Sequence, residues 1–337
     1  MITIDDIRRP IHADLEAFNT FVTDSFSAEG ELLREMLTYA LSSRGKGVRP
    51  ILTLLAASVS NPNTSTANAT GEERNCTKRT YLAAMLVEMI HTASLIHDDV
   101  LDSADERRGR ASINAKWQSN MAVILGDYIL ARTLSLGMAS AQYDLISYIG
   151  TAMATLCEGE VLQSQHARNF DTTRDDYFDI IYQKTASLLG VSAALGALSV
   201  GAPRESVERM RKFGEAIGIA FQIQDDILDY NRVNNTGKPA NNDLREHKIT
   251  LPLIEVMERA TEEERAKIIT LLKRCHEDET AVDKLQEIVI KNNGTTLAAE
   301  TMHAHIARAM HHLSHYPESP YRTALMQLCT FIAERDK

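Results

Sequence analysis

The sequence has few of the residues that interrupt helices or build disulfide frameworks. Its 337 residues include 16 glycines, 8 prolines and 4 cysteines, and aromatic residues make up only 6%. The cysteines lie far apart without Cys-x-x-Cys spacing, which argues against zinc ligation and against a disulfide-stabilised secreted fold. The low glycine and proline content is typical of a helical protein.

Two further absences exclude classes of protein. The sequence has 36 Lys and Arg against 46 Asp and Glu, and this net charge of −10 argues against a nucleic-acid-binding protein. No segment reaches about 18 uninterrupted apolar residues, and the sequence starts with acidic rather than basic residues. We therefore expect a cytoplasmic protein without a transmembrane segment, in which any site for an anion is locally basic.

The sequence does contain a helical hydrophobic pattern. Apolar residues recur at helical spacing in five long segments, whereas sustained alternation of strand type is hard to find. These segments are 81–96, 121–138, 177–200, 207–227 and 251–272. The pattern predicts an all-α protein with a single domain over residues 1–337 and a flexible polar loop at about 61–80.

The most informative motif is the pentad Asp-Asp-x-x-Asp, which occurs three times. Two copies, Asp98–Asp102 and Asp225–Asp229, follow apolar segments and so lie late in helices, where the helix dipole disfavours negative charge. The first and last Asp of each share one helix face, and such clustered carboxylates need a cation, for which Mg²⁺ is the natural choice. The third copy, Asp175–Asp179, follows Thr173 at capping-box spacing, so we interpret it as a helix N-terminus.

Basic residues around the first pentad predict an anion site. Arg107 and Arg108 follow it closely, and their planar guanidinium groups match phosphate oxygens. Upstream, Lys46 and Arg49 stand on a glycine-flanked turn, where backbone can approach a phosphate. Salt bridges on a solvated face are the alternative for the arginine pair, and an ordinary basic loop is the alternative for the turn. Taken together, the carboxylates and cations predict metal-assisted recognition of diphosphate groups.

These motifs, in this order and spacing, resemble the head-to-tail trans-prenyltransferases, the polyprenyl diphosphate synthase family. The resemblance covers roughly residues 30 to 335. It rests on Gly45-Lys46 to Arg49-Pro50, His91 to Asp102 with Arg107-Arg108-Gly109, Lys184-Thr185, Phe221-Gln222 to Asp229, and Gly237-Lys238-Pro239 to Asp243 with Lys248 to Pro252. The sequence departs from the family pattern with Gly47 where Arg is usual, and with Asn241 and His247 where Gly is usual.

The resemblance implies an isoprenoid-synthase helical bundle around a central active-site cavity, acting as a Mg²⁺-dependent prenyltransferase and forming a homodimer. The substrates are isopentenyl diphosphate and an allylic diphosphate, and the product can pass to a membrane. The residues implied to serve the metal ions are Asp98, Asp99, Asp102, Asp225, Asp226 and Asp229. Those implied to hold substrates are Arg107, Lys184 and Lys238 for the allylic diphosphate, Lys46, Arg49, His91 and Arg108 for isopentenyl diphosphate, Thr185 and Gln222 at the reaction centre, and Lys248 beside the metals.

Product length is predicted from the helix that ends at the first pentad. Ala93 and Ser94, with Ile90 deeper, lie beneath Asp98, where large aromatic residues close the cavity in short-chain members of the family. These small residues predict a long product, C30 to C50, for quinone side chains. Close helix packing is another use of small residues, and geranylgeranyl or farnesyl diphosphate is the alternative product.

Three other functions fit less of the sequence. A class I terpene cyclase does not need the second diphosphate site at Lys46 and Arg49. A phosphohydrolase built on His97-Asp98 leaves the twin pentads unexplained. A non-catalytic subunit of a heteromeric prenyltransferase typically has degraded aspartates, whereas both pentads are whole here.

Overall fold

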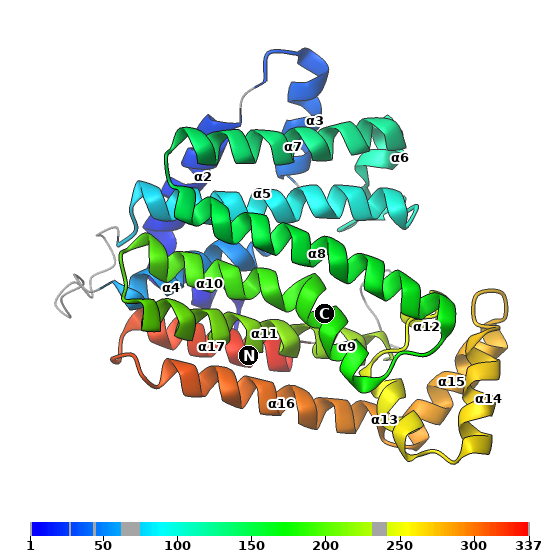
Figure 1. Ribbon diagram of the computed structural model, residues 1–337. Coiled ribbons are helices and arrows are strands. Elements are labelled where there is room, and N and C mark those ends of the chain that lie inside the picture. The colour runs from blue at the N-terminus through cyan, green and yellow to red at the C-terminus, as the bar shows by residue number, and fades with distance from the viewer. Residues whose placement is uncertain (1, 27, 43–44, 62–74, 231–240, 336–337) are drawn as a thin grey trace. The chain divides into compact units, whose positions relative to one another are not determined.

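The structure is a computed structural model that describes residues 2–26, 28–42, 45–61, 75–230 and 241–335. Within these ranges nearly all regular structure is helical, which confirms the predicted all-α class (Figure 1). The exceptions are two strands of two residues each, β1 (Glu106–Arg107) and β2 (Arg110–Ala111). Most of the predicted loop at 61–80 lies outside the described residues.

The described residues form a series of helices along the chain. In the N-terminal half they are α1 (Ile4–Arg8), the 3₁₀ helix η1 (Arg9–Ile11), α2 (His12–Ser25), α3 (Glu31–Ser42), α4 (Val48–Ser60), α5 (Lys78–Leu101), α6 (Ile113–Trp117), α7 (Ser119–Ala139) and α8 (Tyr143–Asn169). After these come α9 (Arg174–Ile181), the π-helical turn η2 (Tyr182–Ala186), α10 (Ser187–Ser199), α11 (Arg204–Asp229), α12 (Asn242–Arg245), α13 (Leu251–Arg259), α14 (Glu262–Leu272), α15 (Glu279–Lys291), α16 (Gly294–Leu313) and α17 (Pro320–Glu334).

The chain divides into two compact units. Unit 1 comprises residues 1–153, 191–211 and 313–327, and unit 2 comprises residues 154–190, 212–312 and 328–337. The boundaries fall inside α8, α10, α11, α16 and α17 rather than in linkers. The single domain predicted from the sequence therefore stays a prediction.

The core of unit 1 is built on α4 and α5. Thr77 caps α5 through a reciprocal hydrogen-bond pair with Thr80, and every residue from Thr80 to Ile90 is buried. A helix that is buried on all sides needs neighbours around its whole circumference. For α5 these include α2, α4 and α7, and Figure 1 shows α7 running alongside it. The buried half of α5 thereby fixes the position of its C-terminal end, which carries the first pentad.

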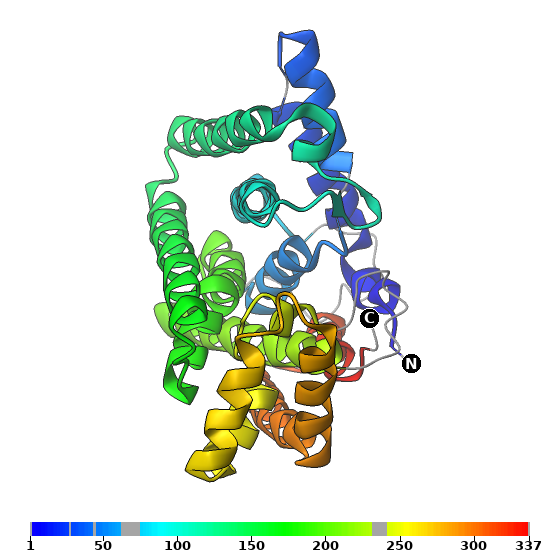
Figure 2. The same ribbon diagram turned by 90° about the vertical axis from the view of Figure 1, so that its right-hand side faces the viewer.

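In unit 2, α13, α14 and α15 pack against one another (Figure 2). The apolar segment 251–272 was predicted as one helical stretch, but the structure breaks it into α13 and α14. Thr261 starts the second helix through a capping box with Glu264. The break therefore follows a sequence signal that competes with the hydrophobic period.

One helix of unit 1 is unusually apolar. By length and composition alone, α7 is long and apolar enough to cross a membrane, and 33% of its apolar 18-residue stretch is buried in the structure. Its exposed apolar side chains are Val123, Ile124, Leu134 and Met138. These residues form an apolar face that points away from the core of unit 1.

Candidate active site

The first pentad lies at the C-terminal end of α5, as predicted. Asp98 and Asp99 belong to the last turn, and Asp102 is the C-cap residue. Asp99 is buried and accepts a hydrogen bond from Arg107 Nε at 2.7 Å, with Arg107 Nη2 at 2.6 Å from the same oxygen. Asp98 is half-buried and Asp102 is exposed. The carboxylates of the pentad are therefore not equivalent, because Asp99 already faces a guanidinium.

A short hairpin places the two arginines that follow the pentad. The strands β1 and β2 pair antiparallel, with Arg107 opposite Arg110. Between them Arg108 and Gly109 adopt φ values of 57° and 71°, the left-handed conformation that tight hairpin turns require. The sequence showed only that these arginines follow the pentad closely, and the structure shows that they lie on a hairpin.

A small pocket of about 60 Å³ adjoins this hairpin. Its polar lining includes Tyr39, Glu88, His91, Asp99, Arg107 and Arg108. The Tyr39 hydroxyl donates to the carbonyl oxygen of Ala111 at 2.8 Å, which attaches the hairpin to α3. Several of the predicted site residues of unit 1 thus line one pocket.

Gly45 allows Arg108 to reach this position. A Cβ atom built on Gly45 would lie 2.6 Å from Cζ of Arg108 and 2.8 Å from Nη2. Such distances are well inside van der Waals contact. The guanidinium of Arg108 therefore lies directly on the turn that carries Lys46, and any side chain at position 45 displaces it.

The turn itself joins the N-terminal helices to α4. Gly47 adopts a φ of 62° and is the N-cap residue of α4, while Lys46 is exposed. The carbonyl oxygen of Lys46 accepts a hydrogen bond from Arg8 Nη2 at 2.6 Å. Contacts from α1 and from the hairpin thus hold the turn on two sides.

The cations of unit 1 are crowded. Burial lowers the pKa of Arg49 to about 10, an effect that Glu88 opposes and Arg108 increases. Burial and the positive charges of Arg49 and Arg108 lower the pKa of His91 well below its usual value, so His91 is neutral at pH 7. Arg49 Nε is buried without a hydrogen-bond acceptor among the described residues. Crowded cations and an orphaned buried donor are what a bound anion would satisfy.

Glu88 is a functional candidate that the sequence analysis missed. Its side chain is buried in the apolar half of α5 and lines the pocket, and its charge opposes the lowering of the pKa that burial causes in Arg49 and Arg108. The sequence signal for this residue was a single carboxylate in an otherwise apolar helical segment, three residues before His91. It offsets part of the repulsion between the cations and thereby keeps them together.

The second pentad closes α11 in unit 2, also as predicted. Asp225 pairs with Arg335, and Asp226 is buried with both carboxylate oxygens hydrogen-bonded. Asp226 Oδ2 accepts from the hydroxyl of Tyr177 at 2.6 Å, and Oδ1 accepts from Gln222 Nε2 at 2.9 Å. All three aspartates of this pentad therefore have described partners, since Asp229 accepts from two backbone N–H groups of α12.

Negative charge accumulates at this end of α11. Burial and the Asp229 carboxylate raise the pKa of Asp243 to about 7. Burial followed by the charge of Asp243 raises the pKa of Asp226, and burial raises the pKa of Asp229. Carboxylates held together in this way are stabilised by a cation, and an all-oxygen donor set suits a hard divalent ion.

No protein-only metal cage is present in the part of the chain that the structure describes. There, no three His, Cys, Asp or Glu side chains converge closely enough to hold an ion by themselves. Mg²⁺ usually keeps several waters and takes substrate phosphates as ligands, so it does not require a cage of protein side chains alone. The residues present are therefore compatible with a magnesium ion that binds together with a diphosphate.

A second pocket, of about 120 Å³, lies beside the pentad of unit 2. Its lining includes Lys184, Thr185, Gln222, Asp226, Asp243 and Lys248. Lys184 Nζ lies 2.7 Å from Glu160 Oε1 and 2.8 Å from Gln163 Oε1, and Thr185 donates to Gln222 Oε1 at 3.1 Å. Lys184 and Thr185 stand on the π-helical turn η2, a geometry found frequently at functional sites. The structure thus brings together four predicted substrate residues with Asp226.

Other predicted residues have simpler outcomes. Lys238 lies outside the described residues. Asn241 and His247 have φ values of 61° and 60°, so both departures from glycine occur where the backbone is left-handed. Ala93 and Ile90 are buried on α5, and the half-buried Ser94 donates to the carbonyl oxygen of His91. The role of these residues in product length stays a prediction.

The chain is similar to known proteins over most of its length. A family model described as polyprenyl synthetase matches residues 30–289. The chain is 35% identical to the all-trans-nonaprenyl-diphosphate synthase (geranyl-diphosphate specific) of Rhodobacter capsulatus, covering 98% of this chain and 97% of that protein. It is 29% identical to the octaprenyl diphosphate synthase of Escherichia coli over 100% of both.

Solved structures show the same similarity. The crystal structure of a decaprenyl diphosphate synthase from Rhodobacter capsulatus has a TM-score of 0.87 and 31% sequence identity, covering 99% of this chain and 100% of that one. A polyprenyl synthase from Caulobacter crescentus, complexed with calcium and isoprenyl diphosphate, has a TM-score of 0.87 at 28% identity, covering 99% and 98%.

Proposed function

Because this chain belongs to the polyprenyl synthetase family, we propose that it is a polyprenyl diphosphate synthase. It condenses isopentenyl diphosphate head-to-tail with an allylic diphosphate and releases an all-trans product. The proposal rests on two intact aspartate pentads, on a cationic pocket lined by Arg107 and Arg108, and on Arg49, whose buried Nε lacks an acceptor among the described residues.

In unit 1 the cations are assigned to isopentenyl diphosphate. Lys46, Arg49, His91 and Arg108 bind its diphosphate, and a neutral His91 serves as a hydrogen-bond donor. Arg107 binds the allylic diphosphate. This assignment is supported by the contact of its guanidinium with Asp99. The carboxylates of Asp98, Asp99 and Asp102 serve Mg²⁺.

In unit 2 the residues are assigned to the allylic diphosphate and the reaction centre. Lys184, Lys238 and Lys248 bind phosphate oxygens, and Thr185 and Gln222 lie at the reacting carbons. Asp225, Asp226 and Asp229 serve Mg²⁺, directly or through water. Burial is the main cause of the raised pKa values of Asp226 and Asp229, and these values support the assignment because a divalent cation stabilises the charged form of a buried carboxylate.

The chemistry follows from these charges. A magnesium ion held by the pentads would supply positive charge to the departing diphosphate. Arg107 and the lysines assigned to the allylic diphosphate hold the same oxygens, so the allylic C–O bond breaks with both electrons leaving on the diphosphate. The double bond of isopentenyl diphosphate attacks the allylic carbon, and a proton is then lost to the departed diphosphate. No protein base is required for this sequence of steps.

We assign a long product, C30 to C50, such as a quinone side chain. Similar proteins are named nonaprenyl and octaprenyl diphosphate synthases, and the residues beneath the first pentad are small. The alternative is a short product, and a geranylgeranyl pyrophosphate synthase from Lactobacillus brevis has a TM-score of 0.84 at 27% identity. Product length alone separates the two proposals.

We also propose a cytoplasmic homodimer that hands its product to a membrane. The exposed apolar face of α7, with Ile124 56% and Met138 54% exposed, supports burial against a second copy. A heteromeric enzyme is the alternative, since one similar protein is a heptaprenyl diphosphate synthase component 2. Light scattering of the purified chain, together with its activity without a partner, distinguishes the two.

The central experiment is a product assay. Purified protein, Mg²⁺, farnesyl diphosphate and labelled isopentenyl diphosphate are expected to give a polyprenyl diphosphate of C30 to C50 on reversed-phase chromatography. An end point at C15 or C20 refutes the long-chain assignment. Failure to consume isopentenyl diphosphate with any allylic starter refutes the proposed function itself.

A further inference from the structure

The third aspartate pentad, Asp175–Asp179, has no metal-binding arrangement in the structure. The Thr173 hydroxyl accepts from the backbone N–H of Asp176, and the Asp176 carboxylate accepts from the backbone N–H of Thr173 at 2.9 Å. These two bonds form the predicted capping box at the start of α9. The third pentad therefore marks the start of α9. The contribution of α9 to the site follows from its other contacts.

The middle residue of the same pentad contacts the candidate active site. Tyr177 is 3% exposed and donates its hydroxyl to Asp226 Oδ2 at 2.6 Å. Gln222 donates to the other oxygen of Asp226 and in turn accepts from Thr185. A continuous chain of hydrogen bonds therefore runs from Tyr177 through Asp226 and Gln222 to Thr185. Each side chain in this chain of hydrogen bonds is oriented by its hydrogen-bond partner.

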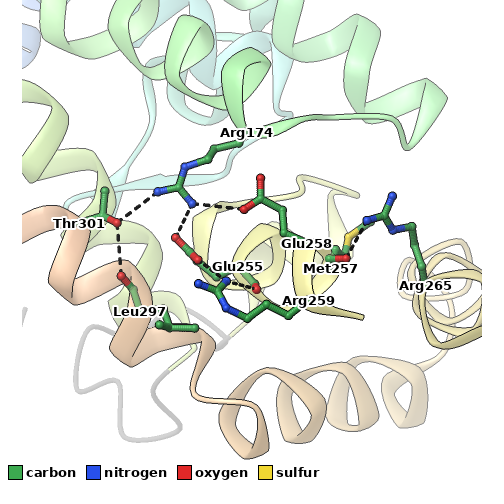
Figure 3. A network of polar contacts seen from close by, with 8 residues as sticks. All are labelled: Arg174, Glu255, Met257, Glu258, Arg259, Arg265, Leu297 and Thr301. Carbon is green, nitrogen blue, oxygen red and sulfur yellow. Dashed lines mark hydrogen bonds and ion pairs between the residues drawn. The ribbon is translucent and has the colours of Figure 1, made fainter. Parts of the chain in front are cut away.

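The N-terminal end of α9 is anchored independently. Arg174 forms an ion pair with Glu255, which is 3% exposed, and its Nη2 donates to Thr301 Oγ1 at 3.4 Å. Figure 3 shows Arg174 reaching Glu255 on α13 and Thr301 on α16, while Arg259 approaches Glu255 from a further turn of α13. A buried carboxylate with two guanidinium partners is a rigid attachment point. Arg174 and Tyr177 are three residues apart, so the anchored turn of α9 is the one that presents Tyr177.

We propose that Tyr177 is a positioning residue for the second aspartate pentad, and that α9 is the element that holds it in place. The hydroxyl of Tyr177 fixes the rotation of the Asp226 carboxylate, and through it the amide of Gln222. This inference rests on the proposed function, because it assigns the effect to a site that binds Mg²⁺ and diphosphate. Partners that orient a metal-serving carboxylate typically change metal affinity or activity by about 10- to 100-fold when removed.

The test is the substitution Tyr177→Phe, which removes one oxygen and keeps the ring. Tyr182→Phe is the matched control, since Tyr182 donates to Glu215 at 3.0 Å and its side chain is 37% exposed. Calorimetric titration of Mn²⁺ in the presence of inorganic pyrophosphate is expected to show about 10-fold or greater weakening for Tyr177→Phe. Tyr182→Phe is expected to bind within about twofold of the unsubstituted protein, because its partner is a surface carboxylate.

A double-substitution cycle separates positioning from general destabilisation. If Tyr177 acts through Asp226, Tyr177→Phe has little further effect on Mn²⁺ binding in an Asp226→Asn background. Additive effects, or unchanged Mn²⁺ binding by Tyr177→Phe alone, overturn the proposal. Thermal unfolding of the metal-free variants shows whether a variant has lost folded protein. The Mn²⁺ affinities are compared at a temperature below the onset of unfolding. Because this titration does not require turnover, it tests Tyr177 even where the product assay refutes polyprenyl synthesis.

Discussion

Replacement of Gly45 by alanine tests the geometry of the cationic pocket most directly. The new Cβ would lie 2.6 Å from the guanidinium carbon of Arg108, whereas carbon atoms pack at ~3.5–4 Å, so the guanidinium must move by about 1 Å. Gly45 is not among the residues with positive φ, so the alanine itself causes no backbone strain. The substitution therefore displaces a functional group without disturbing the fold around it.

The expected magnitude follows from the hydrogen bonds that Arg108 would lose. A hydrogen bond to a charged group contributes about 1.5–3 kcal/mol, which corresponds to roughly a 10- to 150-fold rise in KM for isopentenyl diphosphate. The KM for the allylic substrate should change little, because Arg108 is assigned to the other diphosphate. The unfolding free energy should change by less than about 1 kcal/mol, since the exposed guanidinium can move aside.

Steady-state kinetics with each substrate varied in turn, and thermal denaturation, measure both quantities. Arg108→Ala sets the upper limit of the effect, and adding Gly45→Ala to it should have no further consequence. Gly150→Ala on α8 is the matched control, because its Cβ would meet nothing within 4 Å. If Gly45→Ala leaves the KM for isopentenyl diphosphate within twofold while Arg108→Ala raises it strongly, the placement of Arg108 on the turn is wrong.

Three further substitutions test other parts of the site. Ala93→Phe should shorten the product by placing a ring beneath the first pentad, and an unchanged chain length on chromatography argues against a product tunnel there. The pKa of His91 is lowered in the folded protein, so unfolding takes up a proton and the stability falls as the pH drops below ~6.5. Between pH 7.5 and 5.5 the melting temperature of His91→Gln should therefore fall by less than that of the unsubstituted protein. An identical fall contradicts a buried neutral His91. Arg8→Ala should raise the KM for isopentenyl diphosphate several-fold by releasing the carbonyl of Lys46, whereas equal effects from Arg9→Ala, which pairs with Asp6, would point to general charge loss.

Local signals in the sequence predicted the elements that carry the site. The first and second pentads lie at helix C-termini because the apolar segments before them are long enough to form buried helices. Thr173 marks a helix start through a capping box that spans only four residues. The capping box at Thr261, where segment 251–272 breaks into two helices, is an equally local signal. The helical spacing of apolar residues continues across it and obscured the break.

The remaining features depend on contacts between distant parts of the chain. The hairpin that carries Arg107 and Arg108 is attached to Tyr39, 72 residues before its hydrogen-bond partner Ala111. Tyr177 and Asp226 are 49 residues apart. The residues of each contact are too far apart in the sequence to form a local pattern. Tertiary packing alone determines which of these side chains meet.

The aromatic contact at the rim of the cationic pocket gives the protein an internal optical probe. Trp117 is the only tryptophan in the sequence, and its ring centre lies 5.1 Å from that of Tyr39, which lines the pocket. Lys116 Nζ lies 4.0 Å from the centre of the Trp117 ring. The intrinsic tryptophan fluorescence of the chain therefore originates at one place beside the proposed isopentenyl diphosphate pocket. Ligands that enter this pocket can be screened by emission alone, without labelling the protein and without a radioactive substrate.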